Sequence, residues 1–149
     1  WKRAMKIETF VLCDAATDCL GKLNILGTFD TIHARQVPAV HPQCAVAIRL
    51  RFDWIERGDH KIRVNMIDAD GRLIVPPLDA GLHVRLPERA SSCAINLVLN
   101  LHSLKFERFG EYSIDLLVDG AEAASLPLFV CQMPAPPAAQ PPAAPPPAQ

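Results

Sequence analysis

Apolar and polar residues alternate along most of the chain, and this two-residue period is typical of strands that bury one face. Turn residues separate the alternating runs, and no run has the period of a helix. The pattern predicts an all-β fold, an antiparallel two-layer β-sandwich of the immunoglobulin-like or Greek-key kind, with a small barrel as the alternative. We expect strands at residues 6–13, 22–31, 43–52, 60–68, 72–75, 81–86, 93–101 and 112–118 and after residue 121, and loops at 14–21 and 35–42.

The closing hairpin has the most regular pattern. Alternate positions from Tyr112 to Val118 are apolar, and Asp119-Gly120 then indicates a tight turn because glycine readily adopts a positive φ. A two-residue loop would pair Tyr112 with Pro127, whereas a three-residue loop pairs it with Leu128 and keeps apolar residues opposite one another. We therefore expect the three-residue loop, because a slip of one residue would turn the apolar face to water.

Two single residues carry further local expectations. Tyr112 follows Gly110 by two positions, which is the arrangement of a tyrosine corner, where the phenol hydroxyl bonds to upstream backbone. The alternative is an ordinary half-buried strand tyrosine. Gly27 lies inside a strand pattern and therefore predicts either a β-bulge or a close approach of the backbone to another group.

A basic patch is our candidate binding surface. The strands at 43–52 and 60–68 are expected to pair through a five-residue loop, so that their outward residues share one face. Arg51 would lie opposite Arg63, a like-charge contact that costs free energy unless an anion lies nearby. The patch would dock an acidic partner or a phosphate-bearing ligand; the alternative is a solvated face neutralised by carboxylates. It consists of Arg49, Arg51, Lys61 and Arg63.

Composition limits the class of protein. With 149 residues, half of them hydrophobic, the chain is long enough for one core, and we expect a single domain at residues 5–132. The net charge of −1 argues against a nucleic-acid or acidic-membrane partner. We expect neither a membrane span nor a signal peptide, with Met5 as the natural start. Residues 133–149 are rich in proline and alanine and predict a disordered tail that acts as a spacer or, alternatively, as a ligand for an aromatic groove.

The five cysteines are odd in number and form no CxxC motif, so we expect free thiols and a cytoplasmic protein. An immunoglobulin-type disulfide between Cys44 and Cys93 is rejected on two grounds. Ser91 stands where a tyrosine should precede the second cysteine, and Trp54 falls at a strand end instead of a strand centre.

Catalytic chemistry is weakly supported by the sequence. No catalytic residue and no cofactor is assigned, because no motif for a nucleophile or a phosphate-binding loop is present. A metal-dependent enzyme remains an alternative if His41, His83 and Asp79 converge in space. Asp68 and Asp70 resemble the start of a calcium loop, but the sequence continues directly into a strand, so a hairpin turn explains them better.

The chain resembles a bacterial family, domain of unknown function 6941. The resemblance implies a small bacterial β-sandwich domain, often with a variable tail, and it implies no activity. It covers residues 5 to about 130. The segments that carry it are MKIETFVLCDAATD from Met5, GKLNILGTFDTI from Gly21, HPQCAVAIRLRF from His41, NLVLNL from Asn96 and GEYSIDLLVDG from Gly110.

These observations favour a protein of unknown function that acts as a non-enzymatic binding or adaptor module. The expected partner is another protein, contacted by the loops or by a sheet face, with the tail as a tether. A homodimer is a further expectation, because an unprotected edge strand invites a second copy to pair with it.

Overall fold

The structure, a computed structural model, describes residues 5–139. That part of the chain forms strands joined by short loops and one 3-10 helix. The elements are β1 (Lys6–Cys19), β2 (Lys22–Thr28), β3 (Thr31–Ala34), β4 (Ala39–Asp53), the 3-10 helix η1 (Trp54–Glu56), β5 (Gly58–Ile67), β6 (Leu78–Val84), β7 (Ser92–Phe106), β8 (Gly110–Val118) and β9 (Ala121–Gln132).

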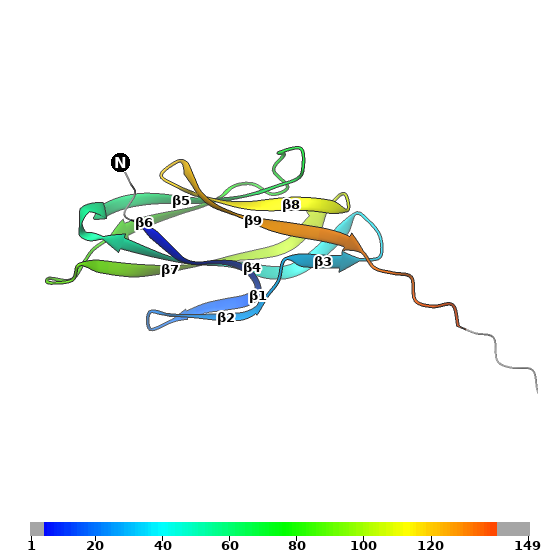
Figure 1. The fold of residues 1–149 in the computed structure, drawn as a ribbon, viewed down its shortest axis with the longest axis horizontal. Coiled ribbons are helices and arrows are strands. Elements are labelled where there is room, and N and C mark those ends of the chain that lie inside the picture. The colour runs from blue at the N-terminus through cyan, green and yellow to red at the C-terminus, as the bar shows by residue number, and fades with distance from the viewer. Residues whose placement is uncertain (1–4, 140–149) are drawn as a thin grey trace, which may run out of the picture.

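The strands form two sheets that lie one above the other (Figure 1). Sheet A has the order β2-β1-β4-β7, and sheet B has the order β3-β9-β8-β5-β6. Neighbouring strands are antiparallel except for β3, which runs parallel to β9. The predicted all-β class is therefore confirmed. Within the described residues, no helix is long and apolar enough to cross a membrane.

The predicted pairing of residues 43–52 with 60–68 is wrong. β4 pairs with β1 and β7 in sheet A, whereas β5 pairs with β8 and β6 in sheet B. The helix η1 separates the two strands and carries the chain from one sheet to the other. Its first residue is tied to the residue that precedes β7, because the Trp54 N–H donates to the Ser91 carbonyl at 3.2 Å.

One hydrophobic cluster joins the two sheets. Inward residues of β4 meet inward residues of β5 and β8, and many of them have no exposed surface. The inward and outward assignment of these strands from their alternation is confirmed. The largest fully buried side chains are Phe52, Phe106, Ile48, Leu50, Ile62, Met66, Leu104, Ile114, Leu116 and Leu128.

The hairpin of β8 and β9 has the expected register but not the expected loop. Tyr112 lies opposite Leu128, as predicted. At the turn, however, Val118 already pairs with Ala121, so the loop has the two residues Asp119-Gly120, both with positive φ. A register shift between Leu116 and Leu117 inserts one residue and restores the apolar pairing.

The first hairpin, formed by β1 and β2, is longer than expected and covers part of sheet A. Residues 14–19 continue β1 and pair with β2 instead of forming a loop. Beyond Cys13 the hairpin bends away from β4, and its apolar residues cover the outer face of the sheet. Cys13, Ala45 and Ala47 are completely buried there, packed against Leu23 and other residues.

Gly27 marks a close approach and not a bulge. The register between β1 and β2 is continuous across it. Its φ is +65°, and a Cβ at this position would lie 2.5 Å from Oδ2 of Asp14. Glycine therefore lets the carboxylate of Asp14 sit directly against the β2 backbone.

The tyrosine corner and the free thiols are confirmed. The Tyr112 hydroxyl donates to the Arg108 carbonyl at 2.7 Å. All five cysteines are free, and Cys44 and Cys93 lie at distant positions of the β4–β7 pair, opposite Leu101 and Phe52 respectively. Burial raises the pKa of the Cys44 thiol to about 11, so this thiol stays protonated at neutral pH.

Several other boundaries differ from expectation. The strand predicted at 22–31 ends at Thr28, and Thr31–Ala34 form the separate strand β3. Residues 72–75 form only an isolated bridge, Ile67 with Leu73, and β4 and β6 begin earlier than predicted. β9 ends at Gln132, and the Met133 N–H donates to the Ala34 carbonyl at 2.8 Å. Residues 133–139 are exposed and have no regular structure. The rest of the predicted tail lies outside the described residues.

Candidate functional site

The structure divides the predicted basic patch into two pairs. Arg49 and Arg51 lie on the outer face of sheet A, because the alternate residues of β4 point into the core. Lys61 and Arg63 lie on the outer face of sheet B, on β5. The patch was predicted as one surface because β4 and β5 were expected to pair. Whether either pair binds a partner stays a prediction.

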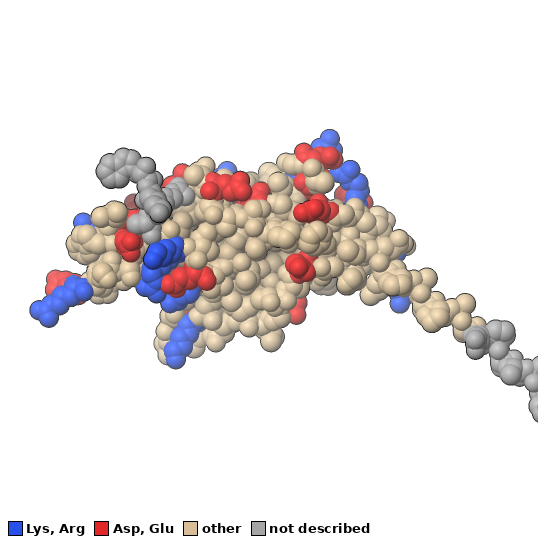
Figure 2. Space-filling view, in the orientation of Figure 1, with Lys and Arg blue, Asp and Glu red and all other residues tan. Residues whose placement is uncertain are grey.

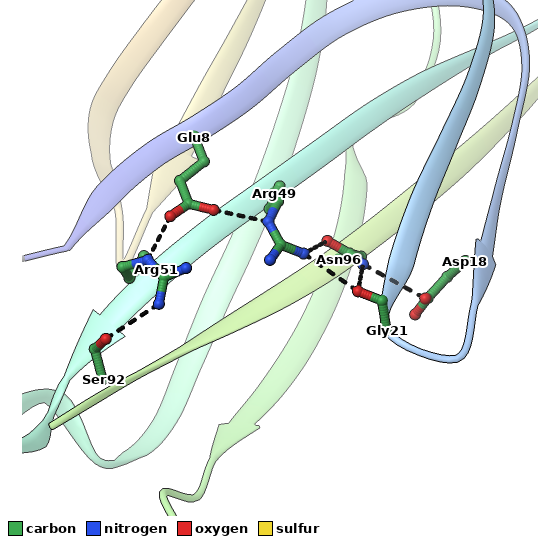
Figure 3. A network of polar contacts seen from close by, with 7 residues as sticks. All are labelled: Glu8, Asp18, Gly21, Arg49, Arg51, Ser92 and Asn96. Atoms are coloured by element: carbon green, nitrogen blue, oxygen red, sulfur yellow. Dashed lines mark hydrogen bonds and ion pairs between the residues drawn. The ribbon is translucent and has the colours of Figure 1, made fainter. Parts of the chain in front are cut away.

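On sheet A, one carboxylate holds both arginines (Figure 3). Glu8 on β1 accepts a hydrogen bond from Nε of Arg49 at 2.7 Å and another from Nε of Arg51. Both bonds lower the pKa of the Glu8 carboxyl below its usual range, and the bond from Arg51 has the larger effect. The like charges of the two guanidinium groups are thus partly compensated by one carboxylate from the neighbouring strand.

The same network fixes the tip of the first hairpin against sheet A (Figure 3). Nη1 of Arg49 donates to Oδ1 of Asn96 at 2.8 Å and to the Gly21 carbonyl at 3.4 Å. Nδ2 of Asn96 donates to the Gly21 carbonyl at 3.2 Å and to Oδ1 of Asp18 at 3.4 Å. Nη1 of Arg51 donates to Oγ of Ser92 at 3.1 Å. Arg49 and Arg51 therefore already have structural partners on β1, β7 and the hairpin.

On sheet B, Arg63 pairs with Asp79 of β6. Nε and Nη2 of Arg63 donate to the two carboxylate oxygens at 2.6 and 3.0 Å, and the pairing lowers the pKa of Asp79. A hollow of about 500 Å³ lies beside this pair and is bordered also by Lys61 and Leu117. Both side chains of the ion pair are about half exposed, so the pair contributes little to stability.

The residues of the metal hypothesis are not brought together. His83 and Asp79 are on β6 of sheet B, where they pair with Asp59 and Arg63 respectively, whereas His41 is on β4 of sheet A. Within residues 5–139, no group of three or more His, Cys, Asp or Glu side chains is arranged to hold a metal ion.

Asp68 and Asp70 form the turn that was the alternative to a calcium loop. Oδ1 of Asp68 accepts the N–H groups of Asp70 and Arg72, each at 2.9 Å. The pKa of the Asp68 carboxyl is lowered mainly by the hydrogen bond from the Arg72 N–H. Nη2 of Arg108 lies 3.4 Å from Asp68 and 2.7 Å from Asp70, so a guanidinium group compensates both carboxylates.

Sequence reasoning missed an exposed apolar group at the end of β4. Trp54 and Ile55 on η1 are 47% and 80% exposed. The guanidinium carbon of Arg57 lies 3.7 Å from the centroid of the Trp54 ring, a cation–π contact. The signal was a tryptophan and an isoleucine placed directly after an alternating strand, where a loop should be polar.

The apolar group borders a hollow of about 530 Å³. Its lining combines large apolar side chains with cationic ones and contains no acidic residue. The lining residues are Trp54, Ile55, Arg57, Gly58, His83, Val84, Arg85 and Leu86. Such a hollow is suited to an apolar side chain that has a carboxylate beside it.

Helix η1 is held firmly in place. Oε2 of Glu56 accepts the Asp53 N–H at 3.0 Å, and Oε1 of Glu56 accepts the Met5 N–H at 2.8 Å. The Glu56 carbonyl lies 2.6 Å from Nε2 of His60, and Nδ1 of His60 lies 2.7 Å from Oδ2 of Asp119. These contacts join η1 to the start of β1 and to the β8–β9 turn.

His60 predicts a pH dependence of stability. Burial acts to lower the pKa of His60, but its bonds to the Glu56 carbonyl and to Asp119 outweigh burial and raise it. Only the imidazolium donates to both acceptors. Because the pKa of His60 is raised in the folded state, its contribution to the free energy of unfolding is complete below pH 6.5, the ordinary pKa of histidine. The contribution is lost as the pH rises through the folded-state pKa. We expect His60→Ala to cost about 1–2 kcal/mol at about pH 5.5 and less at about pH 8.5.

Denaturant unfolding at both pH values measures this difference. His83→Ala is the matched control, because the His83 and Asp59 side chains are 51% and 90% exposed and their pairing adds little at any pH. An equal cost of His60→Ala at both pH values would contradict the imidazolium bridge.

Figure 2 shows how charge is distributed over the face that has β1 and β9 in front. Basic side chains gather beside acidic ones near the N-terminal end of β1, and a wide part of the remaining surface is uncharged. On this face, acidic and basic side chains are mixed, and no large area carries charge of one sign.

Comparisons with known proteins give one informative result. A search of curated proteins gave no match. Among solved structures, the Pseudomonas fluorescens alkylpurine DNA glycosylase AlkC, bound to DNA containing an abasic site analog, is similar with a TM-score of 0.45 and 10% identity. The likeness covers 88% of this chain and 31% of the glycosylase chain, and it is too weak to carry an argument. The model of a family of unknown function, DUF6941, matches residues 8–131. The chain therefore belongs to the DUF6941 family.

Proposed function

We propose that the chain is a non-enzymatic binding module with the fold of a two-layer, immunoglobulin-like β-sandwich. It contacts another protein through the η1 end, which is the surface formed by helix η1 and the hollow beside it. The observation that carries this proposal is the exposed pair Trp54 and Ile55 on a short, firmly held helix. Large exposed apolar residues are costly to leave in water, and tryptophan with arginine is the combination most enriched among residues that dominate binding energy.

The chemistry of the hollow indicates the kind of partner segment. Trp54 and Ile55 supply apolar contact area, while Arg57 and Arg85 supply charge at its border. A partner segment with a large apolar side chain next to Asp or Glu would fit both features. Because Glu56 fixes the helix before binding, little conformational entropy is lost when the partner docks.

Affinity capture with the full chain tests this proposal. We expect Trp54→Ala to lose a protein partner that the unaltered chain retains, with a reduction in affinity of at least about tenfold. The matched control is Leu73→Ala, because Leu73 is 50% exposed but lies outside the hollow. Identical partners for both variants and the unaltered chain would contradict the proposal.

The two basic pairs, Arg49 with Arg51 on sheet A and Lys61 with Arg63 on sheet B, are two further candidate surfaces, and the same capture tests them. Arg51→Ala tests the pair on sheet A, and Arg63→Ala tests the pair on sheet B. A truncated chain tests the tail as a tether, and it should end after Met133, because Met133 is bonded to the Ala34 backbone. A partner that needs the tail would assign recognition to the proline-rich segment instead.

A further inference from the structure

Among the described residues 5–139, β7 is an edge strand, and no strand pairs with its outer edge. It stands at the end of the sheet A order, and its neighbour in the sheet is β4. It is 15 residues long, and the stretch from Ser92 to Leu104 contains no Lys, Arg, Asp or Glu. A long uncharged edge exposes a row of backbone N–H and C=O groups to any strand that can pair with it.

The other three edge strands carry features that oppose such pairing. β3 is four residues long. β2 has the positively charged Lys22 and the positive-φ Gly27. β6 carries Asp79 and Gly81 and follows two prolines, Pro76-Pro77. Short length, charge, glycine and nearby proline are the devices by which proteins prevent association between sheet edges. The stretch of β7 from Ser92 to His102 has no Lys, Arg, Asp or Glu, no glycine and no proline, and the positive-φ Ser103 and the charged Lys105 lie beyond it.

The apolar inner side of β7 is incompletely covered. Ile95, Leu97 and Leu99 belong to the core side of the strand, yet they are only partly buried, whereas the equivalent residues of β4 have no exposed surface. A further strand beside β7 would complete their burial. The edge therefore offers both hydrogen-bonding groups and apolar area to a partner.

The sequence of the edge is complementary to itself. If two copies of β7 pair antiparallel about a two-fold axis through Val98, each residue meets the one equally far on the other side of the axis. Asn96 then meets Asn100, Leu97 meets Leu99 and Ile95 meets Leu101. In these three pairs, the polar residues of the outer side lie opposite each other, and the apolar residues of the inner side lie opposite each other. An interface around a two-fold axis requires this self-complementarity.

We propose that the chain forms a homodimer in which two β7 strands pair antiparallel about Val98 and join the two copies of sheet A into one continuous sheet. This interface is independent of the η1 end and adds an assembly state to the proposed binding function. Each copy would present its own hollow, so one dimer would engage two partner segments.

Sedimentation of the full chain measures the assembly state. At about 100 µM we expect a mass of twice the 16.3 kDa of the monomer. The double variant Asn96→Asp with Asn100→Asp places two Asp–Asp contacts across the axis and should weaken the dimer about tenfold. The double variant Asn96→Asp with Asn100→Lys places Asp opposite Lys in both contacts and should retain it.

The two variants share Asn96→Asp, so its effect on the contacts of Asn96 with Gly21, Asp18 and Arg49 is common to both. Circular dichroism confirms that each variant is folded before its mass is compared. A monomeric unaltered chain would overturn the proposal. A dimer that both double variants retain equally would also overturn it, because the interface would then lie elsewhere.

Discussion

Replacing Phe52 by alanine is expected to lower the free energy of unfolding by about 3–5 kcal/mol. Phe52 is fully buried, and its ring centroid lies 4.9 Å from that of His60. Because Phe52 belongs to sheet A and His60 to sheet B, truncation opens a cavity where the two sheets meet. Denaturant unfolding followed by circular dichroism measures the loss.

Phe29→Ala is the matched control for this substitution. Phe29 is only partly buried and packs at the border of the same hydrophobic cluster. We expect a loss of about 1–2 kcal/mol, because less apolar area returns to water and the site can collapse more freely. Equal losses for the two phenylalanines would contradict the assignment of Phe52 to the centre of the core.

Tyr112→Phe is expected to lower the free energy of unfolding by about 1–2 kcal/mol. The hydroxyl of Tyr112 donates to the Arg108 carbonyl at 2.7 Å and accepts the Arg108 N–H at 3.4 Å. Phenylalanine keeps the edge-on packing against Phe106, whose ring centroid is 5.0 Å away, so the loss reports the hydroxyl alone. Thermal and denaturant unfolding both measure it.

Ser125→Ala controls for loss of a hydroxyl at a solvated position. The Ser125 hydroxyl donates to Oδ1 of Asp115 at 2.6 Å on the exposed face of the β8–β9 hairpin. Its removal should change stability by less than about 0.5 kcal/mol, because water replaces the lost partner. A Tyr112→Phe effect no larger than this would show that the tyrosine corner does not stabilise the fold.

The assembly proposal and the binding proposal fail separately. Because Trp54 lies on η1 and outside β7, Trp54→Ala should leave the sedimented mass unchanged. The substitutions of Asn96 and Asn100 lie outside the hollow and should leave intrinsic partner capture by each copy unchanged. A result in one experiment therefore does not decide the other.

The sequence by itself determined most of the strands and the inward faces of β4, β5 and β8. Strict alternation from Tyr112 to Val118 assigned the buried side of β8, and the requirement that apolar residues oppose one another assigned the β8–β9 register. The loop length was predicted wrongly, because a two-residue turn with a bulge gives the same register further along the strands as a three-residue loop. The alternation of apolar and polar residues shows which face of a strand is buried, but it does not show where the backbone bulges or turns.

Only the tertiary structure decided which strands pair. An alternating pattern states that a strand buries one face, but any other such strand is an acceptable neighbour. The three residues of η1 therefore sufficed to send β4 and β5 to different sheets, and the predicted basic patch was divided with them. The partner of Arg49 and Arg51 is Glu8, more than 40 positions away, and nothing local to β4 indicates it.

The extension of β1 has the same cause. Thr17 and Asp18 are typical loop residues, yet both lie in β1 because β2 returns beside them and supplies the hydrogen-bonding partners of a ladder. The bend that follows lays apolar residues of this hairpin over Ala45 and Ala47, which are too small to hold the hairpin away from the sheet. Local propensity determined where strands could form, and long-range pairing determined where they end, because the hydrogen bonds of a sheet are satisfied by residues distant in the sequence.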